Sequence, residues 1–403
     1  MSQTDSDDLQ LNQGADLNTI TTAVPFLQIT PDSRSAALGD AGVAISPSAN
    51  SFFWNTSMLA HTTDDVELAL SYRPWLRSLA SDIHLSHISG YKRINERNVV
   101  GGSLRFFSLG EITFTDQNAG VIMNHNPNEF EILAGYSYQL NDNYSLGING
   151  KFIFSNLTAG IMVEGAQTQP GLAGAADVSF SYFNDDVQIS PGGGSVAFGA
   201  TLNHVGNKIS YTELDERDFL PTNLRIGSAL EFDLDAGYNT LTWAFDLSKL
   251  LVPTPPNISP DGEIRAGLNP NVGVVPGMIQ SFYDAPGVLV RDQSGNFVQN
   301  PDGSYQVESG SVFREEMSEI MISTGLEYWY NQVFAARMGY FHEAVTKGAR
   351  QYFTFGIGLK YNAFGMDLSY LTTISRNNPL QNTVSFTLRF FLDKIVSQSS
   401  AFE

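Results

Sequence analysis

The sequence predicts an all-β fold, a 14-stranded antiparallel transmembrane β-barrel with an N-terminal plug in its lumen. Three observations support this prediction. Stretches of roughly ten residues alternate between apolar and polar side chains. The connections between these stretches are long and short in turn, as in barrels that have tight turns at one end and longer loops at the other. A segment of different character, rich in small residues and turns, precedes the first stretch.

The expected strands share one pattern. In the last strand, Val384, Phe386 and Leu388 lie on one face, while Ser385 and Thr387 lie on the other. Because successive side chains of a strand point to opposite faces, one face can meet lipid while the other meets a polar interior. A large soluble β-sandwich or β-helix also alternates and is the alternative fold. The strands are expected near 66–75, 82–91, 97–107, 129–140, 143–156, 174–184, 195–206, 220–234, 238–249, 318–330, 333–343, 351–361, 363–374 and 382–392.

The connections divide into two kinds. Those after even-numbered strands are mostly tiny, such as Asn141-Asp142 and the single Asn362, with 185–194 as a longer exception. Those after odd-numbered strands are long and include 108–128, 157–173, 207–219 and 250–317. We therefore expect a barrel over residues 61–392, a long extracellular loop at 250–317 and a C-terminal tail at 393–403.

Composition excludes several classes of protein. The chain has no cysteine, so it has neither disulfides nor a cysteine-based metal site. Its net charge of −20 argues against a nucleic-acid partner, because binding to phosphates requires Lys and Arg. The first eight residues lack the basic and apolar regions of a signal peptide, so we expect a mature or engineered form. Glu315, Glu316 and Glu319 are expected to be solvated charges at the barrel rim, with calcium bridging or repulsion of anionic surface polymer as the alternatives.

The residues before the first strand predict a tail and a plug. Residues 1–18 are polar and are expected to be disordered. Residues 19–60 are expected to fold inside the barrel, because the lumen of such a barrel is too wide for its wall side chains to fill. There Arg34 would need a carboxylate, since an unpaired buried charge is costly, and Asp32 or Asp40 is the expected partner.

Motifs in this plug carry a resemblance to a known family. They are Pro25-Phe26-Leu27, Pro31-Asp32-Ser33-Arg34, Gly39-Asp40-Ala41-Gly42-Val43-Ala44 and Trp54-Asn55. With fourteen strands after it, this segment resembles the FadL-type outer-membrane barrels and, within them, the PorV family of the Bacteroidetes type IX secretion system. The resemblance implies a multi-pass barrel in the outer membrane of a Gram-negative bacterium. The plug residues it marks are Pro25, Phe26, Asp32, Arg34, Gly39, Asp40, Gly42, Trp54 and Asn55.

The resemblance also implies a function that is not enzymatic. PorV-like barrels act as outer-membrane shuttles that bind secreted client proteins through a C-terminal β-domain. The partners implied are the type IX translocon barrel, the clients, the cell-surface attachment complex and outer-membrane lipid. The alternative is FadL-type uptake of fatty acids or other hydrophobic small molecules. Gly101, Gly102, Gly356 and Gly358 would serve uptake by kinking the wall, or would allow close packing against the plug, which we favour.

The long loop 250–317 is the expected client-binding region, because its apolar content exceeds what a passive connection needs. The alternative is a lid that packs on itself. The candidate residues are Val274, Val275, Met278, Ile279, Phe282 and Tyr283, with Phe114 from 108–128 as a secondary candidate. The 108–128 segment is otherwise a simple strand extension.

No catalytic motif stands out. His84 and His87 are three residues apart on an expected strand, so they point to opposite faces and cannot share a metal ion. His342-Glu343 lacks the second histidine of the helical zinc motif. We therefore expect neither an enzyme, nor a metal site, nor a cofactor.

Overall fold

A computed structural model describes most of the chain, and the described residues fall into two units. The residues described are 17–77, 80–115, 120–158, 160, 162–163, 166–212, 217–235, 237–375 and 378–394. The first unit, here called the insert, comprises residues 17–21, 249–321 and 343–350, and the second, the barrel unit, comprises the rest. Most of the expected tail 1–18, and all of 393–403 beyond residue 394, lies outside the described residues.

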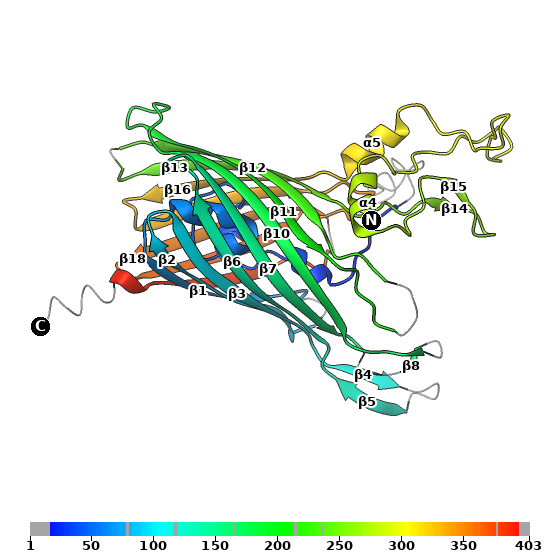
Figure 1. Cartoon of the computed structure of the whole chain (residues 1–403), viewed down its shortest axis with the longest axis horizontal. Helices are drawn as coiled ribbons and strands as arrows, with labels where there is room; N and C mark the ends of the chain where they lie inside the picture. Colours follow the sequence, from blue (N-terminus) through cyan, green and yellow to red (C-terminus); the bar gives the residue numbers. More distant parts are fainter. Residues whose placement is uncertain are drawn as a thin grey trace, which may run out of the picture. The chain divides into compact units, whose positions relative to one another are not determined.

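Fourteen strands close into one antiparallel barrel, as the alternating pattern predicts (Figure 1). Each pairs with its neighbour in sequence, and the first closes on the last, with Glu67 opposite Phe391. The strands are β1 (Val66–Pro74), β2 (Ile83–Asn95), β3 (Asn98–Leu109), β6 (Asn128–Gln139), β7 (Tyr144–Asn156), β10 (Gly171–Asn184), β11 (Gly194–Gly206), β12 (Asn223–Asp233), β13 (Thr240–Leu250), β16 (Met321–Tyr330), β17 (Phe334–His342), β18 (Gln351–Tyr361), β19 (Phe364–Thr373) and β20 (Thr383–Phe391).

The long connections carry structure of their own. Between β3 and β6 a hairpin forms from β4 (Ile112–Thr115) and β5 (Val121–His125), and the next long connection holds β8 (Met162–Val163) and β9 (Ala166–Gln167). The connection from β13 to β16 holds β14 (Asn257–Ile258), β15 (Ile264–Ala266), α4 (Val274–Gln280) and α5 (Ser311–Ser318). The strand expected from 318 therefore begins only at Met321, because α5 extends to Ser318.

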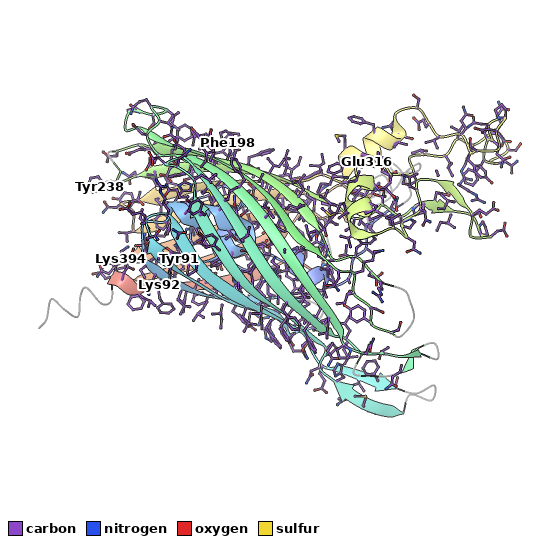
Figure 2. The ribbon with its side chains drawn as sticks, in the orientation of Figure 1. Tyr91, Lys92, Phe198, Tyr238, Glu316 and Lys394 are labelled. Carbon is purple, nitrogen blue, oxygen red and sulfur yellow. The ribbon has the colours of Figure 1, made fainter. Side chains whose placement is uncertain are left out.

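The wall of the barrel has its apolar side chains outside and its charges inside. Along β2, Tyr91 is only 3% exposed, whereas the next residue, Lys92, is exposed; both are labelled in Figure 2. On β11, Phe198 is 51% exposed, and on β6, Ile132 is 50% exposed. The buried charges on the wall include Arg105, Glu131, Lys151, Asp177, Arg225, Asp246, Glu327, Arg337 and Asp367. Such a distribution is the reverse of a soluble core and is what a barrel in lipid requires.

Four short helical turns precede β1 and lie within the ring of strands (blue in Figure 1). They are η1 (Pro25–Gln28), α2 (Ser33–Ala37), α3 (Ser51–Trp54) and η2 (Thr56–His61). Asp32 caps α2 by accepting a hydrogen bond from the Ser35 backbone, and Asn55 caps η2 in the same way through Ser57. Among the described residues, no helix combines the length and apolarity needed to cross a membrane. We call residues 22–62 the plug.

The inside-out distribution predicts a position-dependent cost of charge on the outer face. Replacing Ile132, in the middle of β6, by Arg is expected to lower the free energy of unfolding by about 2–4 kcal/mol. Tyr361→Arg, at the end of β18, is the matched control and is expected to cost only about 0–1 kcal/mol. Urea unfolding in lipid vesicles measures both values, and equal costs would contradict a lipid-facing wall.

Candidate functional site

The plug is fixed to the barrel wall by a buried chain of ion pairs. Arg34 binds both carboxylate oxygens of Glu327 on β16, at 2.7 and 2.9 Å. Glu327 also accepts from Arg337 on β17, which in turn reaches Asp367 on β19 at 2.7 Å. All four side chains are at most 8% exposed. Two positive and two negative charges thus compensate one another where water is excluded.

The expected partners of Arg34 were wrong, because Asp32 and Asp40 have other roles. Asp32 accepts hydrogen bonds from the Ser35 backbone and from the Trp54 indole at 2.8 Å. Asp40 accepts from the Tyr352 hydroxyl on β18. The residues that sequence reasoning missed are Glu327, Arg337 and Asp367. The signal that points to them is a charge on the lumen-facing side of an alternating strand.

Aromatic side chains of the plug lie against arginines of the wall. The Arg105 guanidinium lies 5.6 Å from the ring centre of Phe26 and 4.8 Å from that of Phe53. Arg225 lies 4.9 Å from the ring centres of both Phe53 and Trp54. Cation–π contacts of this kind are strongest where the cation is shielded from water. Predicted plug residues Phe26 and Trp54 therefore help to fill a charged lumen.

The plug approaches the wall so closely that the wall needs glycines there. A Cβ atom at Gly339 would lie 2.1 Å from the Gly39 backbone, one at Gly356 2.4 Å from the Ala37 side chain, and one at Gly101 2.8 Å from Phe52. The same holds for Gly135, Gly147, Gly199, Gly227 and Gly325. The packing interpretation is therefore correct for Gly356 and in part for Gly101, whose Cβ would also lie 2.2 Å from the Gly90 carbonyl of β2. A Cβ at Gly358 would instead meet the Arg337 guanidinium, and one at Gly102 the Leu133 carbonyl of β6.

Two glycines of the plug are required in the same way. Gly39 has a φ of 68°, and a Cβ there would lie 2.5 Å from the backbone of Tyr340. A Cβ at Gly42 would lie 2.2 Å from the Trp54 ring. The Gly42 N–H donates to the Asp246 carboxylate of β13 at 2.7 Å. The side chain of the predicted plug residue Asn55 donates to the Val43 carbonyl, and Pro25 opens η1. Except for the exposed Pro25, the predicted plug residues are buried or half-buried, and Arg34, Asp40, Gly42 and Asn55 are hydrogen-bonded to the barrel wall.

The insert is organised around three glutamates. Glu315 and Glu316 belong to α5, and Glu319 directly follows this helix. Lys249 binds Glu316 at 3.1 Å and Glu319 at 2.5 Å. Lys347 binds Glu315 at 2.7 Å and Glu319 at 2.9 Å. The expectation of solvated rim charges is wrong for Glu316 and Glu319, which are each 5% exposed. No sequence motif signals this, because the two lysines come from segments far from α5 in the chain.

Backbone groups complete this cluster and position α4. In the segment that follows α4, the Ala285 N–H donates to Glu316 and the Gly287 N–H to Glu315. Asp284 accepts from the Thr254 backbone at 3.1 Å and from Gln280 at 3.2 Å. The pKa of Asp284 is raised to about 6. The main cause is burial, and the charges of Glu316 and Glu319 act in the same direction, while the two hydrogen bonds act against it.

The predicted client-binding residues of the insert form an exposed apolar stripe. Val275 and Ile279, one helical turn apart on α4, are 61% and 59% exposed, and Phe282 and Tyr283 are 51% and 58% exposed. Val274 and Met278, the other two candidate residues of α4, are half-buried. Phe114 lies apart from this stripe in sequence, half-buried on β4 opposite Met123.

The described residues offer no site for metal chemistry. They contain no group of three or more His, Asp or Glu side chains that could hold a metal ion. What the geometry provides is a lumen occupied by a segment that is ion-paired to its wall, and exposed apolar side chains on an insert held by ion pairs. Fold and site together define an outer-membrane β-barrel with an internal plug.

Comparisons with known proteins identify the family. Residues 12–257 match the family model described as "Type IX secretion system protein PorV", and this match covers more than half of the chain. The chain therefore belongs to the PorV family and is an outer-membrane barrel of type IX secretion. No curated protein matches the chain.

Solved structures with similar coordinates are remote in sequence. The toluene transporter TodX of Pseudomonas putida has a TM-score of 0.49 at 12% identity, covering 94% of this chain and 98% of that one. The toluene transporter TbuX of Ralstonia pickettii has a TM-score of 0.44 at 10% identity, covering 89% and 97%. A FadL homologue of Pseudomonas aeruginosa has a TM-score of 0.43 at 9% identity, covering 93% and 99%.

The plug's ion pairs predict a large effect of removing Arg34. Arg34→Met leaves Glu327 and Asp367 with one arginine between them, and is expected to destabilise the plugged barrel by about 3–5 kcal/mol. Combining it with Glu327→Met, which rebalances the charge, is expected to recover part of that loss. Urea unfolding measures both, and a single variant as stable as the parent would contradict the account.

The Asp284 carboxyl predicts that the insert loosens as pH rises. Its folded pKa of about 6 exceeds the ordinary value of 3.8, so the folded insert binds this proton more tightly than the unfolded chain does. The resulting stability is complete below about pH 3.8 and is lost as pH rises through about 6. Hydrogen exchange of residues 274–284, corrected for intrinsic rates, should therefore be faster at pH 8 than at pH 5. Asp284→Asn should remove the difference, whereas the control Asp302→Asn on the exposed part of the insert should retain it.

Proposed function

We propose that this barrel is a non-enzymatic shuttle of type IX secretion. It binds secreted client proteins through their C-terminal β-domain at the translocon barrel and delivers them to the cell-surface attachment complex. The observation that carries the proposal is the exposed apolar stripe Val275, Ile279, Phe282 and Tyr283. An aqueous surface rarely maintains such a stripe unless a partner covers it.

The insert supplies a rigid base for this stripe. Asp284, Ala285 and Gly287 follow the stripe directly and are hydrogen-bonded to Thr254, Glu316 and Glu315. A partner that lands on a preorganised surface loses less conformational entropy than one that must order it. The stripe is therefore suited to repeated binding and release of clients, with release when the attachment complex processes the β-domain.

The plug supports a role at the surface rather than passage through the lumen. Arg34, Gly42 and Asn55 are hydrogen-bonded to the wall or to neighbouring plug backbone, and a Cβ at wall residues Gly325 and Gly339 would clash with the plug backbone. Uptake of a fatty acid would require an apolar path, whereas the described lumen side chains include a continuous set of ion pairs from Arg34 to Asp367. For this reason we place uptake second.

The proposal predicts the effect of charges on the stripe. An apolar side chain buried at an interface contributes about 1.5–3 kcal/mol, and roughly 1.4 kcal/mol corresponds to tenfold in affinity. The variant Val275→Asp/Ile279→Asp is therefore expected to reduce client recovery more than tenfold. Affinity purification from native membranes in mild detergent, with mass spectrometry of proteins and lipids, provides the measurement.

A matched control separates the stripe from general effects of charge. Val333 is 42% exposed in the turn between β16 and β17, and Val333→Asp is expected to leave client recovery unchanged. Normal client recovery with the stripe variant would show that the stripe is not the binding surface. Recovery of the wild-type barrel alone with stoichiometric fatty acid would favour uptake instead.

A further inference from the structure

The basic side chains of the described insert fall into two groups. Those of the first group bind a glutamate carboxylate at 3.5 Å or less, and they are Lys249, Arg314, Lys347 and Arg350. The second group is Arg265 and Arg291, here called the arginine pair, and neither forms an ion pair with a residue that the structure describes. Carboxylates are abundant in a chain with a net charge of −20, so this lack of a partner distinguishes the pair from its neighbours.

Both arginines of the pair lie on the same aromatic ring. The Arg291 guanidinium is 4.1 Å from the ring centre of Phe297, and the Arg265 guanidinium is 4.9 Å from it. Arg265 also lies 5.7 Å from the ring centre of Tyr305, which packs edge-on against Phe297. A guanidinium stacked on a ring has its face covered, while the N–H groups along its edge stay available. Aromatic rings, and not anions, therefore hold these two cations close together.

A folded segment of the insert, residues 288–308, positions Phe297 and Arg291. We call it the arm. An isolated bridge places these two residues opposite each other within it. Three backbone hydrogen bonds of 2.8–3.0 Å close the arm into a ring, and they run from Val290 to Gln306, from Gln306 to Val298 and from Val298 to Val290. Because the site is preorganised in this way, a ligand that binds there has little conformational entropy to remove.

The guanidinium groups of the pair have unused hydrogen-bonding capacity. Asp292 follows Arg291 directly, but its carboxylate accepts from the backbone N–H groups of Ser294 and Asn296 at 2.8 and 2.9 Å. Arg291 itself donates to the Gly295 carbonyl at 3.1 Å. The buried Nε of Arg265 has no hydrogen-bond partner among the described residues. Two forked donors thus face outward from one ring, and such donors bind carboxylates with two parallel hydrogen bonds.

We propose that Arg265 and Arg291 bind carboxylate side chains of the client's β-domain. This inference rests on the shuttle function proposed above and identifies a second contact for it. Arginine and aromatic side chains are enriched at protein–protein interfaces, whereas lysine is depleted there, and the described site combines the first two without lysine. This composition favours a protein over an anionic polysaccharide as the partner.

The arginine pair and the apolar stripe of α4 would divide the recognition between them. The stripe contributes buried apolar area, which many proteins could supply. The pair selects among those proteins, because a client without matching carboxylates leaves two cations desolvated and unpaired in the interface. Clients are therefore expected to share acidic residues on the surface that meets the insert.

Client recovery by affinity purification from native membranes tests the site. Arg291→Gln is expected to reduce about tenfold the recovery of proteins that share the C-terminal β-domain, because their carboxylates lose a charged partner. Adding Arg265→Gln should reduce it further. The matched control is Arg314→Gln, which removes another exposed arginine of the insert, one that is already paired with Glu308, and should leave recovery unchanged.

The outcomes separate this site from the proposed function. If the wild-type barrel recovers no such proteins, the shuttle function fails and this inference fails with it. If the wild-type barrel recovers them and the double variant recovers as many, the arginine site alone is wrong. Loss of a phosphate- or sulfate-bearing polysaccharide from the variant, with client recovery unchanged, would also overturn the proposal.

A zero-length cross-link identifies the group that the pair binds. Arg291→Lys keeps the positive charge and introduces an amine, which a carbodiimide couples to a carboxylate in direct contact. We expect a cross-linked peptide between position 291 and an Asp or Glu of a client's β-domain. The control Arg314→Lys should couple to Glu308 of its own chain. Coupling in the control, with no client peptide joined to position 291, would overturn the proposal.

Hydrogen exchange shows whether the arm stays folded in these variants. The amides of Val290, Val298 and Gln306 should exchange at the wild-type rate in Arg291→Gln, because their hydrogen bonds join backbone groups only. Reduced recovery with these rates unchanged assigns the loss to the guanidinium. If the amides exchange faster, the cross-link of Arg291→Lys decides, since that variant keeps the charge on the arm.

Discussion

The rest of the structure depends on the need to fill a lumen lined with charged side chains. Wall side chains cannot fill a barrel of this width, and buried charges without partners are costly. The plug meets both demands, since Arg34 pairs with Glu327 and the backbone of Gly42 binds Asp246. Such contacts require the plug backbone to lie directly on the wall, which the wall glycines permit. The sequence of the wall and that of the plug are therefore constrained together.

This constraint decides where the barrel can act. A lumen occupied by a segment with buried ion pairs is unsuited to the passage of folded proteins, so recognition has to occur on exposed structure. In the function that we propose, the insert offers this structure. Lys249 and Lys347 bind Glu315, Glu316 and Glu319 in and just after α5, and Val275 and Ile279 of α4 stay exposed. Membership of the PorV family agrees with a role in secretion.

Local sequence patterns predicted the barrel, but they could not predict ion pairs between residues that are far apart in the chain. The period of two in strands such as β20 and the tight turn at Asn362 depend on neighbouring residues, so both can be read from the sequence. The Arg34–Glu327 pair joins residues 293 apart, and its geometry depends on the register of strands on either side. Glu316 and Glu319 looked solvated because nothing near them in sequence reveals that Lys249 and Lys347 converge there. Gly39 and Gly42 were found because their motif is local to the plug.

The conductance of the barrel in a planar lipid bilayer tests the central claim most directly. The account predicts that the wild-type protein shows no open pore, because the plug fills the lumen and is fixed to β16 through Glu327. A variant lacking residues 22–62 should open large and stable channels, since fourteen strands then enclose an empty polar lumen. Steady porin-like conductance of the wild-type protein would contradict a closed lumen and a function confined to the surface.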